Sequence, residues 1–253
     1  MRVGVTGATG RMGRTVLDVL SDRDAAVAFA VSRSPGAAAG RDVEPSSRFT
    51  DLLTEGSPDV VIDFSAPEAS VEYAAAAANA GVPIVIGTTG LSDEQYAALE
   101  TAGEDGPVLL GANFARGVQA LLGAVERAVS ALPEYDVEVT ETHHNGKRDA
   151  PSGTAGVVLD RIDDARNRES RRVHGREGVA PREADEIGVH ARRAGDVTGE
   201  HEILLAGNHE TLSLTHRAGS REVFAAGAMD AAEWLTTQEP GFYRFTDIAD
   251  RLA

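Results

Sequence analysis

Cysteine is missing from this chain of 253 residues. Its absence excludes disulfides, thiol nucleophiles and cysteine ligands to a metal. Long apolar runs are missing too, since no stretch approaches the roughly 20 residues that span a bilayer. The chain opens with a strand-like segment, which is not typical of a secretory signal peptide. We therefore expect a cytoplasmic protein with no membrane partner.

Positive charge is scarce. The chain has 24 lysine and arginine residues against 40 aspartate and glutamate residues, and its formal net charge is -16 at pH 7. Such a chain repels nucleic acids and anionic membranes, so neither is an expected partner. An anionic small molecule would need local basic side chains to enter. The acidic composition is similar to that of proteins from salt-loving organisms, in which salt screens the repulsion.

Lysine is nearly absent, because Lys147 is the one lysine of the chain. Arginine cannot release a proton at working pH, whereas lysine can. A chain that uses arginine elsewhere and keeps one lysine predicts a proton donor at this position. The residue lies in Glu141–Ala155, which reads Glu-Thr-His-His-Asn-Gly-Lys-Arg-Asp-Ala-Pro-Ser-Gly-Thr-Ala.

The N-terminal residues predict a dinucleotide site. An apolar strand at 2–6 leads into Gly7-Ala-Thr-Gly-Arg-Met-Gly13, and helical spacing follows at 14–20. Glycines allow the backbone to approach a pyrophosphate, and the start of the helix supplies N–H groups. The alternative is a plain tight turn.

The end of the next predicted strand, 26–31, bears on the choice of nucleotide. NAD sites usually have an acidic residue there that binds the ribose 2′-OH. This chain has Ser32-Arg33-Ser34 instead. Arg33 could hold a 2′-phosphate, which favours NADPH and leaves NADH possible. The alternative is that Arg33 is an ordinary solvated charge.

Strands and helices then alternate up to residue 110. The predicted strands are 58–65, 82–86 and 107–110, and the predicted helices are 66–80 and one that begins after Leu91 with Ser92 as its N-cap. This alternation predicts an α/β fold with a doubly wound parallel sheet of the Rossmann type. Ligands of such sheets bind at the carboxyl ends of the strands, so the segments that follow these strands are expected on one edge.

The pattern changes after Pro133. Polar and apolar residues alternate in four segments, which predict strands covered on one face: 135–143, 186–192, 199–205 and 210–216. We expect a second α+β domain with a mixed or antiparallel sheet, spanning 113–230. The region 161–185 is highly charged and is expected to hold helix ends and loops. The first domain would span 1–112 and be completed by 231–253.

The segment Glu141–Ala155 predicts acid–base chemistry. A histidine suits proton transfer near neutral pH, and Lys147 could donate a proton or hold a carboxylate. Ser152, Gly153 and Thr154 could begin a helix whose N–H groups bind an anion. A metal site is an alternative, but no third ligand has metal-site spacing and H-E-x-x-H is absent, so we expect no metal. A surface loop with incidental histidines is the other alternative.

A nicotinamide site and an anion-binding acid–base segment together favour the reduction of a carboxylated small molecule. Two other functions stay open. One is another two-domain dehydrogenase of amino-acid pathways, such as an aspartate or homoserine dehydrogenase, which would not need the paired histidines. The other is a cofactor-binding sensor or scaffold without catalysis, which would tolerate arginine at position 147.

The whole chain resembles the family of 4-hydroxy-tetrahydrodipicolinate reductases, also called dihydrodipicolinate reductases. The segment Glu141–Ala155 is highly specific to it, whereas the glycine loop is shared with many dehydrogenases. The other motifs that carry the resemblance are Gly7–Arg14, Gly87-Thr-Thr-Gly90, Ala112-Asn-Phe114, Glu186–Arg192, Gly195–His201 and Leu214–Arg221.

The resemblance implies reduction of 4-hydroxy-tetrahydrodipicolinate to tetrahydrodipicolinate with loss of water, in diaminopimelate and lysine biosynthesis. It also implies a homotetramer formed through the second-domain sheets. His143 would be the acid–base histidine and Lys147 the proton donor, and His144, Gly153 and Thr154 would bind the substrate carboxylates. The implied cofactor-binding residues are Gly7, Ala8, Thr9, Gly10, Arg11, Met12, Gly87, Thr88, Thr89, Ala112, Asn113, Phe114 and Ala115.

Two positions depart from the family pattern. The family often has a serine where this chain has Ala115, so a hydroxyl is lost while a backbone contact would survive. The acid common at the end of the second strand is replaced by Ser32, which leaves Arg33 as the main polar group on the ribose side. This second departure supports the preference for NADPH.

Overall fold

The computed structural model describes residues 1–23 and 25–252, which form two compact units. Unit 1 contains residues 1–115 and 221–253, and unit 2 contains residues 116–220. The sequence placed the end of the second domain at 230, but the helix at Glu222–Leu235 (α7) belongs to unit 1. It does so because it packs against the first helix and the central strands of unit 1.

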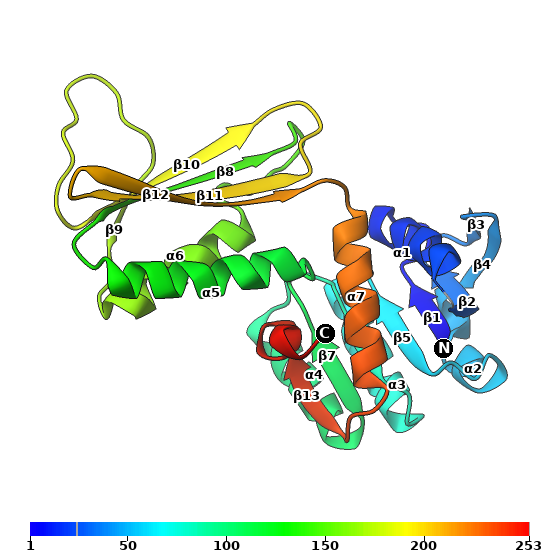
Figure 1. The fold of residues 1–253 in the computed structure, drawn as a ribbon. Helices are drawn as coiled ribbons and strands as arrows, with labels where there is room; N and C mark the ends of the chain where they lie inside the picture. Colours follow the sequence, from blue (N-terminus) through cyan, green and yellow to red (C-terminus); the bar gives the residue numbers. More distant parts are fainter. Residues whose placement is uncertain (24, 253) are drawn as a thin grey trace. The chain divides into compact units, whose positions relative to one another are not determined.

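Unit 1 is built on an eight-stranded sheet with the order β13-β7-β6-β5-β1-β2-β4-β3 (Figure 1). All neighbours are parallel except β3 and β4. The strands are β1 (Arg2–Thr6), β2 (Ala26–Ser32), β3 (Gly36–Ala38), β4 (Arg41–Pro45), β5 (Val60–Asp63), β6 (Ile84–Ile86), β7 (Pro107–Leu110) and β13 (Gly241–Arg244). The strand order reverses beside β1, where a doubly wound sheet binds its ligands.

Two apolar cores cover the two faces of this sheet. Alternate residues of β5 show the arrangement, because Val60 and Ile62 join one core and Val61 joins the other. The first core includes residues of α1 (Arg11–Asp22) and α7. The second includes residues of α2 (Phe49–Glu55), α3 (Pro67–Asn79) and α4 (Asp93–Asp105). The predicted doubly wound sheet is therefore confirmed.

The ends of the unit 1 helices follow local sequence rules. Ser92 accepts a hydrogen bond from the Gln95 N–H, and the Gln95 side chain accepts one from the Ser92 N–H, which completes a capping box on α4. Gly81 follows α3 with a φ of 68°, a conformation that favours glycine. The chain ends in the short helix α8 (Phe245–Ile248), and 3₁₀ turns lie at Ser46–Arg48 and Ala249–Arg251.

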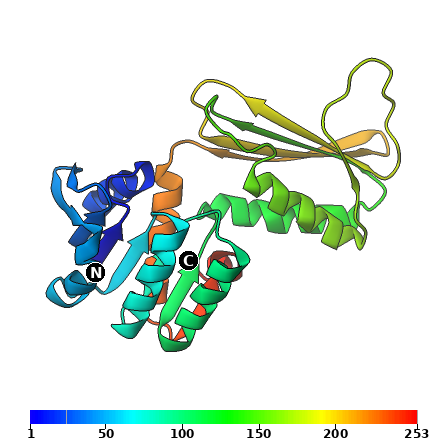
Figure 2. The same cartoon turned by 180° about the vertical axis from the view of Figure 1, so that it is seen from behind.

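Unit 2 is a five-stranded mixed sheet with the order β12-β11-β8-β10-β9 (Figures 1 and 2). The strands are β8 (Asp136–His143), β9 (Arg171–Val173), β10 (Glu186–Arg193), β11 (Gly199–Gly207) and β12 (Glu210–Ala218). Strand β8 pairs with β10 in parallel and with β11 antiparallel, so the predicted mixed sheet is confirmed. A helix that ends at Arg166 agrees with the helix ends expected in the region 161–185, whereas the short strand β9 was not expected there.

Two helices cover one face of the unit 2 sheet, as Figure 1 shows. They are α5 (Arg116–Ala131) and α6 (Gly153–Arg166), which pack against each other and against β12 and β8. Residues of β8 alternate between the two faces, and Val137, Val139, Glu141 and His143 are buried on the helix-covered side. No helix in the described residues covers the other face, which we call the open face.

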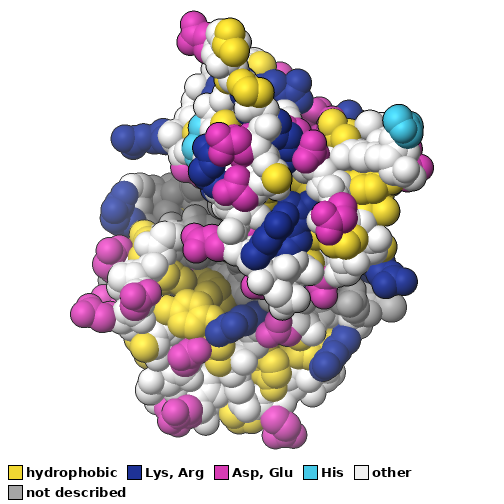
Figure 3. All heavy atoms as spheres, turned by 90° about the vertical axis from the view of Figure 1, so that its left-hand side faces the viewer, with side chains coloured by type: hydrophobic (Ala, Val, Ile, Leu, Met, Phe, Trp, Pro, Cys, Tyr) yellow, Lys and Arg dark blue, Asp and Glu magenta, His cyan; other side chains and the backbone are white. Residues whose placement is uncertain are grey.

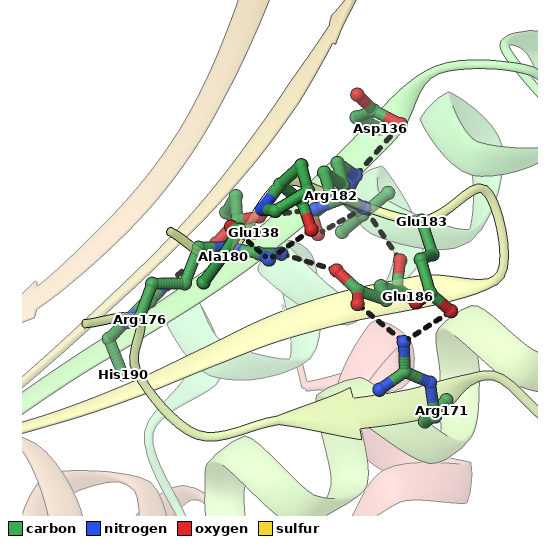
Figure 4. Close-up of polar contacts among 11 residues, drawn as sticks. Asp136, Glu138, Arg171, Arg176, Ala180, Arg182, Glu183, Glu186 and His190 are labelled. Carbon is green, nitrogen blue, oxygen red and sulfur yellow. Dashed lines mark hydrogen bonds and ion pairs between the residues drawn. The ribbon is translucent and has the colours of Figure 1, made fainter. Parts of the chain in front are cut away.

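A network of charged side chains lies against the open face (Figure 4). This open-face cluster consists of Asp136, Glu138, Arg171, Arg176, Arg182, Glu183, Glu186 and His190. Two of its arginines, Arg176 and Arg182, belong to the long segment 174–185 between β9 and β10. Their ion pairs with carboxylates of the sheet strands attach this segment to the sheet.

The excess of acidic over basic residues in the composition is found on the protein surface. In Figure 3, acidic side chains are interspersed with arginines rather than gathered into one field. No helix in residues 1–23 or 25–252 combines the length and apolar character needed to cross a bilayer.

Candidate active site

The glycine loop of unit 1 joins β1 to α1 and is tightly folded. Gly7 has a φ of 63°, and a Cβ placed there would lie 2.2 Å from the Phe64 carbonyl oxygen. A Cβ on Gly13 would lie 2.3 Å from the Gly7 carbonyl oxygen. No other residue fits at these two positions, so helix α1 can start directly against the end of the strand.

The start of α1 fits a bound pyrophosphate. Gly10 is its N-cap, with no side-chain hydrogen bond to the first turn and no acidic residue within that turn. The first N–H groups of the helix thus keep their capacity to donate, and the positive end of the helix dipole favours an anion. The loop residues that the sequence assigned to the cofactor, 7–12, all lie at this point.

The other expected cofactor residues follow neighbouring strands of the same sheet. Thr88 and Thr89 come after β6, and Ala112 to Ala115 come after β7. Asn113 turns back so that its Oδ1 accepts the Ala115 N–H at 2.9 Å. The side chains of Phe114 and Ala115 are buried, and Phe114 belongs to the first apolar core. Only the backbone of these two residues can therefore contact a ligand.

Asp63 is a residue that the sequence interpretation missed. It is fully buried at the end of β5, opposite Thr6 in the register of β1. Its carboxylate accepts hydrogen bonds from the hydroxyls of Thr6, Ser70 at 2.5 Å and Thr88 at 3.0 Å. One carboxylate thus holds the residue before the glycine loop and the first threonine after β6. The sequence feature that could have revealed its role is an acidic residue at the end of an apolar strand.

Arg33 lies just beyond the end of β2 and is exposed. It makes no ion pair with any residue in the described ranges. Beneath it, the Ser32 and Thr9 hydroxyls lie 2.7 Å apart, which connects the end of β2 to the glycine loop. A cation with no acidic partner beside the loop suits the 2′-phosphate of NADPH.

The centre of the unit 2 site is Glu141, which is fully buried. Its Oε2 lies 2.5 Å from Nδ1 of His143, and its Oε1 accepts the Ser152 N–H at 3.2 Å. The guanidinium of Arg193 meets both oxygens, from Nη1 to Oε2 and from Nη2 to Oε1, each at 2.8 Å. This pair and His143 form what we call the buried cluster.

Helix α6 starts inside the same network. Ser152 is its N-cap, and its hydroxyl accepts the Ala155 N–H at 3.2 Å. The same oxygen lies 3.0 Å from Nε2 of His201 on β11. Gly153, the first helical residue, has open space where a Cβ would stand. Gly153 and Thr154, which the sequence assigned to substrate carboxylates, are therefore the first residues of a helix whose N-cap contacts both Glu141 and His201.

Lys147 and His144 lie in the turn between β8 and α6. The Lys147 N–H donates to the His144 carbonyl at 3.1 Å, and Nζ of Lys147 lies 2.9 Å from Asp149 Oδ1. His144 is the first residue after β8, and the turn itself lies at residues 145–146. In the described part of the chain, no three acidic or histidine side chains gather as a metal ion would require.

The buried cluster sets the protonation of its members. Burial raises the pKa of the Glu141 carboxyl, but the hydrogen bonds from Arg193 and His143 outweigh it and leave the pKa below its usual value. Burial lowers the pKa of His143 despite the neighbouring Glu141 carboxylate, and the charges of Lys147 and Arg193 lower it further. Burial likewise lowers the pKa of His201 to about 4. At neutral pH the carboxyl is ionised and both histidines are neutral.

Comparison with known proteins identifies the family. The family model for the N-terminus of dihydrodipicolinate reductase matches residues 1–114, and the model for its C-terminus matches residues 117–249. The chain belongs to the dihydrodipicolinate reductase family. Members of this family are oxidoreductases, which places the chain among enzymes rather than sensors.

Individual relatives agree with this membership. The chain is 58% identical over 247 residues to a 4-hydroxy-tetrahydrodipicolinate reductase of Natronomonas pharaonis, covering 98% of this chain and 99% of that protein. It is 49% identical over 249 residues to the enzyme of the same name from Haloarcula marismortui, with the same coverage. The dipicolinate-bound dihydrodipicolinate reductase of Paenisporosarcina sp. TG-14 shares the fold, with a TM-score of 0.80, 24% identity and 98% and 99% of the two chains covered.

Two residues of the buried cluster have no role in the sequence interpretation. Glu141 contacts His143 directly, and Arg193 contacts Glu141. The alternation of polar and apolar residues in β8 could have singled out Glu141, because it places Glu141 on the same buried face as Val137 and Val139. An acidic residue at a core position needs a cationic partner.

Proposed function

We propose that this chain reduces 4-hydroxy-tetrahydrodipicolinate to tetrahydrodipicolinate, with loss of water, in diaminopimelate and lysine biosynthesis. One reduced nicotinamide nucleotide supplies the hydride, one proton is taken up and one water leaves. The family membership supports this reaction along nearly the whole length of the chain. The dipicolinate-bound relative supports a cyclic dicarboxylate as the ligand class.

One observation carries the assignment of the site: a single buried carboxylate joins a neutral histidine to the start of a helix. Glu141 accepts from His143 and from the Ser152 N–H, so an acid–base group and an anion-binding helix start are held together. His143 is the acid–base residue and Lys147 the proton donor. His144, Gly153 and Thr154 bind the substrate carboxylates.

We assign the cofactor to the carboxyl edge of the unit 1 sheet. The nicotinamide nucleotide supplies the hydride when bound. The glycine loop and the start of α1 hold the pyrophosphate, while the segments 87–89 and 112–115 line the rest of the site. Arg33 binds the 2′-phosphate, which makes NADPH the preferred cofactor.

We further propose that the enzyme is a cytoplasmic homotetramer joined through the unit 2 sheets. The open face supports this arrangement, because no described helix covers it while its strands belong to a regular sheet. Sedimentation equilibrium at constant salt measures the assembly directly. A mass equal to one chain at micromolar concentration would contradict the tetramer.

The activity test uses the purified chain, freshly formed substrate and NADPH in high salt. We expect NADPH oxidation, and we expect Lys147→Arg to lower kcat by about 10²-fold or more, because the charge stays while the transferable proton is lost. Arg148→Lys is the matched control on the exposed neighbouring residue. Unchanged kcat in Lys147→Arg would favour a role without proton donation, and no oxidation by the wild type would overturn the function.

The cofactor assignment has its own test. We expect Arg33→Ser to raise the KM for NADPH about tenfold, since a charge-assisted hydrogen bond contributes about 1.5–3 kcal/mol. The KM for NADH is the internal control and should change little. A wild-type enzyme that strongly prefers NADH in kcat/KM would contradict the proposed role of Arg33.

A further inference from the structure

We propose that the Glu141–Arg193 ion pair positions the catalytic machinery of this enzyme. The proposal rests on the proposed function and gives the pair two tasks. The first is to fix the proton of His143 on Nδ1, which leaves Nε2 for the substrate. The second is to hold the segment before α6 in place. Neither residue touches the reacting atoms in this role. Both act through His143 and through the start of the helix.

The hydrogen bonds around Glu141 determine which nitrogen of His143 carries the proton. Each carboxylate oxygen meets one Arg193 nitrogen at 2.8 Å and one further partner. For Oε1 that partner is the Ser152 N–H, and for Oε2 it is His143 Nδ1 at 2.5 Å. An ionised carboxylate only accepts hydrogen bonds, so Nδ1 must be the donor. The neutral ring then keeps its lone pair on Nε2.

The surroundings leave Nε2 open. No side chain or backbone group in the described ranges forms a hydrogen bond with this atom. Strand β11 passes it at Gly199, where an added Cβ would come within 3.1 Å of Nε2. The ring therefore has one nitrogen fixed by the protein and one that can exchange a proton with a ligand. An acid–base residue oriented by a third group has this organisation.

Arg193 also holds the neighbouring segment of the chain, which precedes α6. It is the last residue of β10 and lies opposite His143 in the parallel register with β8. Its Nη2 donates both to Glu141 and, at 2.6 Å, to the Asp149 carbonyl oxygen. One guanidinium thus connects the buried carboxylate to the chain three residues before the Ser152 N-cap. A lysine cannot reproduce this planar fork.

Replacement of Glu141 by glutamine has a specific consequence. The position of Oε1 faces two donors that cannot become acceptors, namely Arg193 and the Ser152 N–H. The position of Oε2 faces one such donor, Arg193 Nη1, and also His143, whose Nδ1 can accept. The amide oxygen is therefore expected at the position of Oε1 and the amide nitrogen at that of Oε2, where the hydrogen bond from Arg193 is lost. His143 can accommodate a donor at that position only by accepting through Nδ1, which moves its own proton to Nε2. The substitution then blocks the nitrogen that the reaction uses.

Five proteins test the proposal: the wild type, Glu141→Gln, Glu141→Asp, Arg193→Lys and the control Asp163→Asn. Asp163 is a suitable control because it also pairs with an arginine, Arg172, and accepts a backbone N–H, from Ser170 at 3.1 Å, within the same unit. The first readout is the ¹⁵N spectrum of labelled histidine side chains, assigned with His143→Gln. The second is kcat and the KM for substrate across pH.

We expect the Nδ1–H tautomer of His143 in the wild type, in Arg193→Lys and in Asp163→Asn, and the Nε2–H tautomer in Glu141→Gln. The kcat of Glu141→Gln should fall about 10²-fold or more. Arg193→Lys should raise the KM about tenfold with a smaller change in kcat, because a displaced binding segment weakens substrate positioning. Glu141→Asp, which keeps the charge, should retain the wild-type tautomer.

Two results would overturn the proposal. One is an unchanged His143 tautomer in Glu141→Gln with kcat within threefold of the wild type. The other is a loss of activity in Asp163→Asn as large as in Glu141→Gln, which would indicate a general effect of losing an ion pair. The tautomer is measured without substrate, so its outcome is separate from the assay that decides whether the wild type is a reductase at all.

Discussion

Two clusters of the same residue types lie on opposite faces of the unit 2 sheet. In the buried cluster, Glu141 contacts a histidine and an arginine from the strand ends. In the open-face cluster, Glu138 of the same strand contacts His190 at 2.6 Å and also pairs with Arg182 (Figure 4). The two carboxylates are three residues apart and point to opposite faces.

Their surroundings differ in ways that matter chemically. The Glu141 side chain is 0% exposed and that of Glu138 is 28% exposed. Glu141 accepts a fork of two hydrogen bonds from Arg193, one from His143 and one from a backbone N–H, so each of its oxygens has two donors. Arg182 instead divides its donors between Glu138 and the carbonyl oxygens of Val137 and Glu186.

The contrast shows that burial and geometry, rather than residue type, distinguish a cluster that orients a functional histidine from one that only attaches a segment to the sheet. A buried carboxylate with every lone pair occupied fixes the tautomer of its histidine. A part-exposed carboxylate that shares its arginine with backbone carbonyls holds a long segment against a sheet. We therefore expect substitutions in the buried cluster to affect function and stability strongly, and matched substitutions in the open-face cluster to act weakly.

The largest expected difference is in the free energy of unfolding. Glu141→Gln leaves Arg193 with a neutral partner in a buried position and should cost about 3 kcal/mol. Glu138→Gln affects a part-exposed network that salt and water screen, and should cost about 1 kcal/mol or less. Urea unfolding of both variants at one fixed salt concentration measures the difference. Equal costs would show that the two clusters are energetically equivalent and would remove the basis of the comparison.

The next difference concerns acid. Burial lowers the pKa values of His143, His201 and His216, which all face the helix-covered side. For His201 the folded value is about 4 against 6.5 for the free side chain. The unfolded chain therefore binds more protons between these values, and stability is lost as pH falls from 6.5 towards 4, by up to about 3 kcal/mol for this group.

Urea unfolding at a series of pH values from 7.5 to 4.5 isolates this contribution. We expect His201→Gln to reduce the loss of stability on acidification, because glutamine takes up no proton. His216→Gln should do so as well, since burial is the cause of its lowered pKa. If both variants lost stability on acidification as steeply as the wild type, the acid sensitivity would have to come from other groups, among them His143.

The sequence predicted the long periodic elements and missed those that depend on distant partners. The strands from β5 to β7 and the helices between them follow from apolar runs and caps that are local. The short strands β3 and β9 have three residues each and exist because they pair with β4 and β10. No local pattern specifies such pairing.

The site divides in the same way. Lys147, the paired histidines and the start of α6 are close in sequence, so one motif revealed them. Arg193 lies 52 residues from Glu141 and reaches it only through the register that sets Arg193 opposite His143. A shift of that register by one residue would turn its side chain to the open face. The arginine that holds Glu141, and through it the acid–base residue, was therefore not visible in the sequence.

The smallest expected difference is between alanine substitutions of two glycines, one beside each cluster. A Cβ on Gly188 would lie 1.8 Å from Oε2 of Glu138, whereas a Cβ on Gly199 would lie 3.1 Å from Nε2 of His143. Glu138 can swing into solvent, so Gly188→Ala should cost about 1 kcal/mol of stability and leave kcat unchanged. His143 is held by Glu141 and cannot yield, so the methyl group of Gly199→Ala should crowd Nε2 and lower kcat about tenfold.

Measured kcat and urea midpoints for the two alanine variants decide this last point. The closer contact is expected to matter less for activity, because the displaced atom belongs to a flexible and part-exposed side chain. A loss of kcat in Gly188→Ala with normal activity in Gly199→Ala would reverse the roles assigned to the two faces. Retained activity in both would mean that the reaction does not use Nε2 of His143, and the proton would then have to pass through Lys147 alone.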